Sequence, residues 1–174
     1  MDATAKDPLA LAKELAIRLH GQQRYGDEPY EYHLRWVYAT VLKFQRSGID
    51  NDLVAAAAWV HDTLEDTGTQ KDFVSAELGA DIADLVWRVT DEPGETRKER
   101  KTKTYAKIRE RREAVFLKLC DRIANVEAAL ANERDILEKY RKEFNEFEAG
   151  LRSRSDFEDM WRYLSALLRS SPRG

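Results

Sequence analysis

Apolar residues recur along most of the chain at intervals of three and four, which is the spacing that forms one face of an α-helix. Leu11, Leu15 and Leu19 follow this pattern after an Asp7-Pro8 pair, which is typical of a helix start, and Gly21 would end the helix. Runs of alternating β-branched residues, which would indicate strands, are missing from the sequence. The pattern therefore predicts an all-α fold.

Helix caps and helix breakers divide the chain into about eight or nine helices. A loop is expected over residues 22–30, where Gly26 and Pro29 interrupt the pattern, and another over 91–95. Besides the first helix, helices are expected at about 31–46, 50–66, 69–79, 81–89, 96–109, 114–130, 133–149 and 156–170. Since no repeat or linker separates them, we expect one compact domain over residues 1–174, with the C-terminal helices at about 131–170.

The composition fits this fold and excludes several functions. Hydrophobic residues make up 43% of the 174, enough for one core, and the net charge of −3 argues against a general nucleic-acid binder. The single cysteine, Cys120, excludes an internal disulfide, and no apolar run approaches the roughly 20 residues that cross a bilayer. Because Met1 to Asp7 also lack a signal-peptide pattern, we expect a cytoplasmic protein with no membrane or nucleic-acid partner.

The third expected helix carries a cluster of polar groups directly after an apolar stretch at 55–60. In a continuous helix, His61 would lie beside Glu65, and Asp62 beside Asp66, because residues four apart share one side. Charged groups next to a buried stretch are costly to desolvate unless a partner compensates them, and a divalent cation would do so. The mixture of imidazole and carboxylate suits manganese, iron, cobalt or magnesium better than a thiolate-type zinc site.

Two further residues are candidates for the same cluster. His33 lies near the start of an apolar helix, and Asp121 interrupts the apolar run at 114–120. Simpler interpretations exist for each part: a His-Asp pair on a helix is commonly a hydrogen-bonded surface pair, and Asp121 could form a local ion pair with Arg122. The residues taken one by one leave these alternatives open.

The remaining noteworthy side chains receive structural interpretations. His20 is expected to interact with the C-terminal dipole of its helix, and Cys120 to be a small buried hydrophobe. The four tryptophans stand at helical positions and are expected in the core; they are Trp36, Trp59, Trp87 and Trp161.

In this order, His33, His61-Asp62 and Asp121 resemble the H…HD…D signature of the HD phosphohydrolase superfamily. The surrounding residues are similar to the alarmone-hydrolase branch, which comprises the hydrolase domains of RelA/SpoT-type enzymes and the small alarmone hydrolases. The resemblance covers about residues 8–130. The motifs that carry it are Gly21-Gln22-x-Arg24, Pro29-Tyr30-x-x-His33, His61-Asp62-x-x-Glu65-Asp66-Thr67, Leu85-Val86-x-x-Val89-Thr90-Asp91 and Leu117-Lys118-Leu119-x-Asp121-Arg122-x-x-Asn125.

The resemblance implies a helical HD domain that binds one divalent metal, manganese above all. It implies that the enzyme removes the 3′-pyrophosphate from guanosine tetra- or pentaphosphate, a small nucleotide substrate. By position, the metal ligands would be His33, His61, Asp62 and Asp121, and Glu65 and Asp66 would orient and activate the attacking water. The substrate contacts would be Arg24, Arg97, Asn125 and Tyr140.

The sequence also departs from the family pattern near the expected nucleotide side. Tyr25 stands where a second basic residue usually follows Arg24, and Leu34 where a proline commonly follows the metal histidine. Tyr25 keeps open a phosphohydrolase acting on another nucleotide, such as a 2′- or 3′-phosphate of a nicotinamide or adenine dinucleotide. A non-catalytic binding or antitoxin-like protein is a third alternative. Nine Lys or Arg at 97–112 are expected to form mostly a solvated helix face, part of which could attract a polyphosphate.

Overall fold

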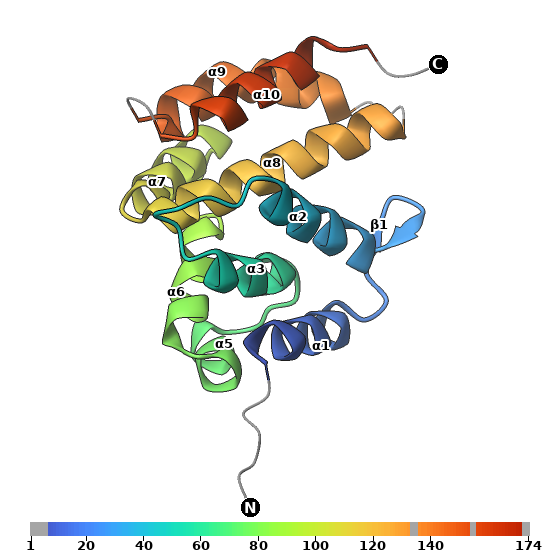
Figure 1. Cartoon of the computed structure of the whole chain (residues 1–174), viewed down its shortest axis with the longest axis vertical. Coiled ribbons are helices and arrows are strands. Elements are labelled where there is room, and N and C mark those ends of the chain that lie inside the picture. Colours follow the sequence, from blue (N-terminus) through green and yellow to red (C-terminus); the bar gives the residue numbers. More distant parts are fainter. Residues whose placement is uncertain (1–6, 133–135, 154–155, 172–174) are drawn as a thin grey trace, which may run out of the picture.

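The computed structural model describes residues 7–132, 136–153 and 156–171, and this part of the chain is almost entirely helical (Figure 1). The prediction of an all-α fold is confirmed. The helices, in chain order, are α1 (Pro8–His20), α2 (Glu31–Lys43), α3 (Asn51–Val60), α4 (Thr63–Asp66), α5 (Lys71–Leu78), α6 (Ala80–Val89), α7 (Arg97–Arg109), α8 (Arg112–Ala131), α9 (Ile136–Leu151) and α10 (Glu158–Arg169).

A small hairpin interrupts the helices where a plain loop was expected. Its strands, β1 (Arg24–Tyr25) and β2 (Glu28–Pro29), pair antiparallel, with Tyr25 opposite Glu28. Gly26 turns the chain with a φ of +63°, a conformation that favours glycine. Two-residue strands are too short to show an alternating pattern, so they could not be predicted from the sequence. In Figure 1 the hairpin projects beside the N-terminal end of α2.

The expectation of one continuous helix over 50–66 is wrong. The side chain of Asp50 caps α3 as expected, accepting from the Leu53 N–H at 3.0 Å, but α3 ends at Val60. The hydroxyl of Thr63 then donates to the Val60 carbonyl at 2.8 Å, and Asp62 adopts a φ of −98° and a ψ of −2° before the single turn of α4. A side chain that bonds a nearby carbonyl competes with helix continuation. His61 and Asp62 therefore lie at a junction between two helices.

Other helix boundaries differ by smaller amounts. α2 ends at Lys43, three residues before the expected end, and α5 begins after Gln70 rather than after Thr69, whose hydroxyl bonds the Thr67 hydroxyl at 2.7 Å. Thr96 caps α7 as expected, accepting from the Glu99 N–H at 3.1 Å. The expected start of the helix at 133–149 lies outside the described residues.

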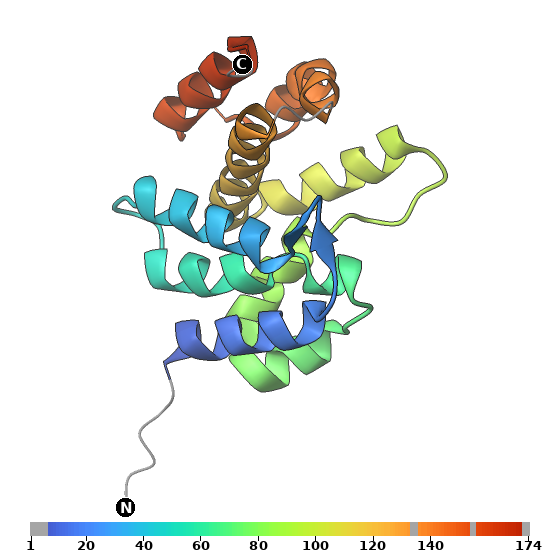
Figure 2. The same cartoon turned by 90° about the vertical axis from the view of Figure 1, so that its right-hand side faces the viewer.

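The core is organised around α3, which lies between α1 and α2 in both views (Figures 1 and 2). Four consecutive alanines of α3, residues 55–58, are buried, and their small side chains let both neighbours approach closely. The long helix α8 crosses above α2, and α9 and α10 cover its opposite side. Phe147 of α9 and Trp161 of α10 belong to the same buried cluster as Phe116 of α8, so these C-terminal helices complete the core.

The tryptophans divide between core and surface. Trp59 and Trp161 are buried as expected, and Trp36 is half-buried with its indole N–H donating to Glu127 at 2.8 Å. Trp87 corrects the expectation of a core position: it is 36% exposed, and the ammonium groups of Lys71 and Lys107 lie 4.5 and 4.4 Å from its ring. Cation–π contacts make this half-exposed position favourable.

Cys120 is a free buried thiol, as expected, and burial raises its pKa well above the usual value. None of the helices formed by the described residues is long and apolar enough to cross a membrane.

Helices α7 and α9 approach closely at Gly150. A Cβ at this position would lie 3.0 Å from Cγ and Cε2 of the Tyr105 ring and closer still to Cδ2. An alanine normally stabilises a helix by about 1 kcal/mol relative to glycine. Here we expect Gly150→Ala to lower the free energy of unfolding by about 1–3 kcal/mol, as overpacking does. Urea denaturation measures this change.

The control is Gly150→Ala in a Tyr105→Ala background, where the obstructing ring is absent. There the substitution should no longer destabilise. An equal loss of stability in both backgrounds would contradict the contact as its cause.

Candidate metal centre

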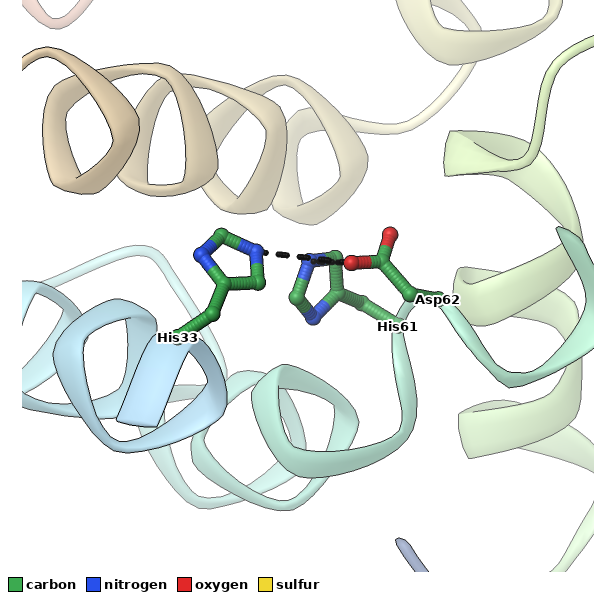
Figure 3. Close-up of side chains that lie close together, drawn as sticks. All are labelled: His33, His61 and Asp62. Atoms are coloured by element: carbon green, nitrogen blue, oxygen red, sulfur yellow. Dashed lines mark ion pairs between the residues drawn. The ribbon is translucent and has the colours of Figure 1, made fainter. Parts of the chain in front are cut away.

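Side chains from two separate parts of the sequence meet beneath α8. His33 lies on the first turn of α2, His61 follows the end of α3, and Asp62 precedes α4. Figure 3 shows the two imidazole rings and the Asp62 carboxylate turned toward one another. One donor atom from each lies within 4.8 Å of the others, a grouping that could hold a metal ion. Asp121 of α8 adds a fourth side chain, and the second carboxylate, at the edge of this group.

The distances among these donors fit a single small cation. Nε2 of His33 and of His61 lie 3.4 and 3.0 Å from Oδ2 of Asp62. Oδ1 of Asp121 lies 3.5 and 3.8 Å from the same two nitrogens. A metal about 2.1 Å from each ligand places neighbouring donors about 3.0 Å apart at right angles and about 3.4 Å apart at tetrahedral angles. The observed spacing therefore suits one divalent ion.

His61 is oriented as a metal-binding histidine would be. Its Nδ1 lies 2.8 Å from the carbonyl oxygen of Ala58, so Nδ1 carries the proton and donates. Its Nε2 is buried and has no hydrogen-bond partner among the described residues. When the ring is neutral, a buried acceptor without a partner is costly, and a backbone carbonyl on the far nitrogen is the usual way of fixing a ligand imidazole. The donor set thus fits a metal that binds imidazole and carboxylate.

Opposite charges hold this site together in the absence of an ion. Burial alone would lower the pKa of His61, but the carboxylates of Asp62 and Asp121 raise it to about 10. Burial would raise the pKa of both aspartates, whereas His61 holds that of Asp62, and Lys118 that of Asp121, well below the usual range. Each buried carboxylate is thereby compensated by a cation.

Lys118 also belongs to the site, although no role was expected for it from the sequence. Its ammonium is largely buried, 3.2 Å from Oδ2 of Asp121 on the next turn of α8. The charges of Asp121, Asp62, Glu65 and Asp91 raise its pKa despite the opposing effect of burial. The ion pair could have been predicted from the spacing, because a lysine stands three residues before the aspartate on an otherwise apolar helix. One ammonium among four carboxylates leaves an excess of negative charge.

Glu65 and Asp66, the expected catalytic pair, both lie on α4 beside the donor group. Glu65 accepts from the Asp91 N–H at 3.2 Å, and burial together with the nearby Asp91 charge raises the pKa of its carboxyl group. Asp66 accepts from the Gln23 side-chain amide at 2.8 Å. The two carboxylates are therefore held by different partners.

Aromatic and amide groups form a second layer around the donors. The hydroxyl of Tyr30 donates to Oδ2 of Asp62 at 2.6 Å, and the ring of Tyr25 stacks on His33 with centroids 4.8 Å apart. The Tyr25 hydroxyl donates to Oδ1 of Asn125 at 2.8 Å, and the Asn125 amide donates to Oδ1 of Asp121 at 2.6 Å. The structure therefore brings Asn125 to the site, where it already binds a candidate ligand.

The other expected substrate contacts lie farther from the donors. Arg24 is exposed, and its guanidinium turns back to the Asp27 carbonyl. Nε of Arg97 donates to Glu143 of α9 at 3.1 Å, and Tyr140 lies beneath the guanidinium of Arg122, 4.8 Å away. Arg97 and Arg122 both pair with Glu143, which connects Arg97 to the surroundings of Tyr140.

The local Asp121–Arg122 ion pair, which the sequence left open, is not the arrangement found. Arg122 points to Glu143 at 3.4 Å, while Asp121 pairs with Lys118. Most of the basic residues at 97–112 are exposed, as expected, but three of the others form ion pairs. Lys101 pairs with Asp91, buried Lys107 with Glu92, and Arg111 with Asp84.

The raised pKa of His61 leads to a specific pH dependence. A group whose pKa is higher in the folded state stabilises the fold below its unfolded value, and that stability is lost as the pH rises through the folded value. For metal-free protein we expect the free energy of unfolding to fall between about pH 6.5 and about pH 10. One proton contributes a slope of up to about 1.4 kcal/mol per pH unit. Chemical denaturation across this range measures it.

Two controls identify the group that is responsible for this slope. His61→Gln should flatten it, and saturating manganese should do the same, because a metal binds the neutral imidazole. A slope that persists unchanged in His61→Gln would contradict the assignment to this histidine.

Comparison with known proteins identifies the family of the chain. A family model described as an HD domain matches residues 10–157. A guanosine-3′,5′-bis(diphosphate) 3′-pyrophosphohydrolase of Aquifex aeolicus is 34% identical over 148 residues, which are 82% of this chain and 21% of that protein. The human guanosine-3′,5′-bis(diphosphate) 3′-pyrophosphohydrolase MESH1 is 41% identical over 93 residues, 52% of this chain and 51% of that protein. The chain therefore spans about half of one curated relative and about a fifth of the other.

A solved structure extends the comparison to the whole fold. The structure of a metazoan ortholog of SpoT, described as hydrolysing ppGpp, has a TM-score of 0.74, with 23% identity and 97% of each chain covered. At this identity the likeness concerns the fold alone, and it includes the helices that follow the donor-bearing part. With the family model matching residues 10–157 and the fold shared throughout, the chain belongs to the HD domain family.

Proposed function

We propose that this protein hydrolyses guanosine 3′,5′-bis(diphosphate), and the corresponding pentaphosphate, to pyrophosphate and GDP or GTP. The observation that carries the proposal is the convergence of four donors on one small site with the carboxylate of Glu65 beside it. The pyrophosphohydrolases of Aquifex aeolicus and human to which the chain is similar support this substrate class. Residues 1–174 would then form one HD hydrolase domain.

In this proposal His33, His61, Asp62 and Asp121 hold one divalent metal ion, manganese. The orphaned Nε2 of buried His61 and the mixture of imidazole and carboxylate donors support such an ion. When bound, the ion lowers the pKa of a water molecule and polarises the phosphoryl oxygen that it touches. The single buried, reduced cysteine is in keeping with a cytoplasmic location.

Glu65 is the proposed general base. The backbone N–H of Asp91 fixes its carboxylate, and the raised pKa of its carboxyl group favours uptake of a proton near neutral pH. The water oxygen forms a bond to the phosphorus attached to the 3′ oxygen. The bond between that phosphorus and the 3′ oxygen breaks, and the 3′ oxygen takes up a proton. Asp66, the second carboxylate of α4, assists by orienting the attacking water.

The nucleotide would contact Arg24, Arg97, Asn125 and Tyr140. Arg97 is half-exposed and bound to Glu143, so a phosphate group would replace one carboxylate by another anion at the same guanidinium. Asn125 lies close enough to the metal donors to contact both the substrate and Asp121. Arg24 stands on the exposed hairpin, from which its side chain would turn toward the nucleotide.

A second candidate is an HD phosphohydrolase for another phosphorylated nucleotide, such as a dinucleotide 2′- or 3′-phosphate. The observation that favours it is Tyr25, whose uncharged ring stacks on His33 where the family usually has a basic residue. The part of the substrate next to the metal would then meet the flat apolar face of Tyr25 instead of a positive charge.

The first test measures pyrophosphate release from guanosine tetraphosphate with manganese present. We expect Asp62→Ala to abolish turnover, because it removes a metal donor. Glu65→Ala should lower kcat by roughly 10²–10⁴-fold, the usual contribution of a general base. Asp72→Ala, which removes an exposed carboxylate from α5, is the matched control and should leave the rate unchanged.

The outcomes separate the candidates. Pyrophosphate release at the native rate in Glu65→Ala or in Asp62→Ala would contradict the proposed mechanism. Phosphate release from a dinucleotide phosphate, with none from guanosine tetraphosphate, would favour the second candidate. Tight binding of guanosine tetraphosphate without turnover of any nucleotide would indicate the non-catalytic alternative.

The role of Tyr25 is tested by Tyr25→Phe, which keeps the ring on His33 and removes the hydrogen bond to Asn125. A net hydrogen bond contributes about 1 kcal/mol, so we expect KM for the nucleotide to rise roughly fivefold while kcat changes little. Tyr32→Phe makes the same chemical change on the neighbouring tyrosine and should alter KM less. A fall in kcat at constant KM would instead place the Tyr25 hydroxyl among the groups that act on the reacting atoms.

A further inference from the structure

A chain of side-chain hydrogen bonds runs from the end of α1 to the carboxylate of Asp66. Nδ1 of His20 lies 2.8 Å from Oε1 of Gln23, and Nε2 of Gln23 donates to Oδ2 of Asp66 at 2.8 Å. Forty-three residues separate Gln23 from Asp66 in the sequence. This link therefore joins the segment after α1 directly to α4.

The chemistry of the groups fixes the direction of every bond in this chain. An ionised carboxylate only accepts, so Gln23 must turn its amide nitrogen to Asp66 and its oxygen to His20. Nδ1 of His20 must then carry a proton and donate it. Burial lowers the pKa of His20 and so disfavours the charged ring, and its buried Nε2 has no hydrogen-bond partner among the described residues.

The two residues are themselves rigidly held. The Gln23 N–H donates to the His20 carbonyl at 2.8 Å, and the Gln23 carbonyl accepts from the Tyr30 N–H at 3.0 Å. The His20 ring stacks on Tyr30 with centroids 4.4 Å apart, and the Tyr30 hydroxyl binds Asp62. His20 thus contacts both Gln23, which binds Asp66, and Tyr30, which binds Asp62.

Asp66 needs such a support. It is exposed and ends a single turn of helix, where a carboxylate is free to rotate unless something binds it. His20, by contrast, is only 6% exposed. If His20 only filled space, phenylalanine would give a more stable fold, since an apolar ring leaves no buried acceptor without a partner.

We propose that His20 and Gln23 are positioning residues that hold the Asp66 carboxylate at a fixed angle to the metal donors. The inference rests on the proposed function, because it takes Asp66 to orient the attacking water. His20 does not touch the substrate. It fixes the Gln23 amide, and the amide fixes Asp66.

The test compares three variants of these residues for turnover and thermal stability. His20→Phe keeps the stacked ring and removes the donor, Gln23→Leu removes the amide, and His20→Asn keeps a donor at the position of Nδ1. We expect His20→Phe and Gln23→Leu to lower kcat by roughly 10–100-fold at nearly constant KM, as the loss of supporting hydrogen bonds does. His20→Asn should recover most of kcat.

Stability separates positioning from packing. His20→Phe should be at least as stable as the native chain, and His20→Asn less stable, so kcat and melting temperature should move in opposite directions. Rates that instead follow the melting temperature would overturn the proposal. Gln22→Leu, the same change on the exposed neighbouring side chain, is the control and should leave kcat unchanged.

Coupling to Asp66 gives the next test. In an Asp66→Ala background the carboxylate is gone, so His20→Phe should cause no further loss of kcat. A further loss equal to the one in the native background would overturn the proposal, because His20 would then act through another group.

The hydrogen-bond chain is also tested without any turnover. The chain has three histidines, so a nitrogen-15 NMR spectrum of the imidazoles assigned with His20→Phe identifies the tautomer of His20. We expect the Nδ1-protonated neutral form, and its loss in Gln23→Leu. A His20 ring without a proton on Nδ1 would overturn the inference, whereas native protein inert toward guanosine tetraphosphate would contradict the proposed function alone.

Discussion

The structure depends on the burial of carboxylates that must each be compensated. Asp62 and Asp121 face two buried imidazoles and the ammonium of Lys118, and Glu65 and Asp91 add further negative charge. A carboxylate removed from water is tolerated only when cations and hydrogen-bond donors replace the lost hydration. Without an ion, the pKa of His61 is raised until the ring itself becomes the cation. The site is therefore stable when empty and still attracts a divalent ion.

This electrostatic constraint accounts for the local shape of the chain. If α3 continued past Val60, the side chains of residues 61 and 62 would point about 100° apart around one helix axis. The break before α4 instead lets His61 and Asp62 turn toward the same point, 3.0 Å from each other. At this break the Thr63 hydroxyl donates to the Val60 carbonyl, and Nδ1–H of His61 donates to the Ala58 carbonyl. The irregular backbone is thus the part that assembles the donors.

The helices could be predicted from periodicity because their apolar faces follow the core, as Leu15 of α1 and Leu164 of α10 do. The break at residue 61 was missed because no glycine or proline marks it, and because periodicity does not reveal the side-chain bonds of His61 and Thr63 to nearby carbonyls that form it. The four donors were found through their order in the chain, which a family pattern preserves. Lys118, Tyr30 and His20 were missed because their roles follow from partners distant in sequence, such as Asp62 for Tyr30.

Helix α8 connects the site to the rest of the molecule. One side of it carries Lys118, Asp121 and Asn125, spaced three and four residues apart, and the other side carries Phe116 in the core under α9 and α10. Arg122, next to Asp121, stacks over Phe147 of α9 at 4.4 Å and reaches Glu143. A rotation of α8 that moved the Asp121 carboxylate would therefore disturb the packing of α9 as well. Because interiors are close-packed, the C-terminal helices hold the fourth donor at its angle to the histidines although they contribute no donor themselves.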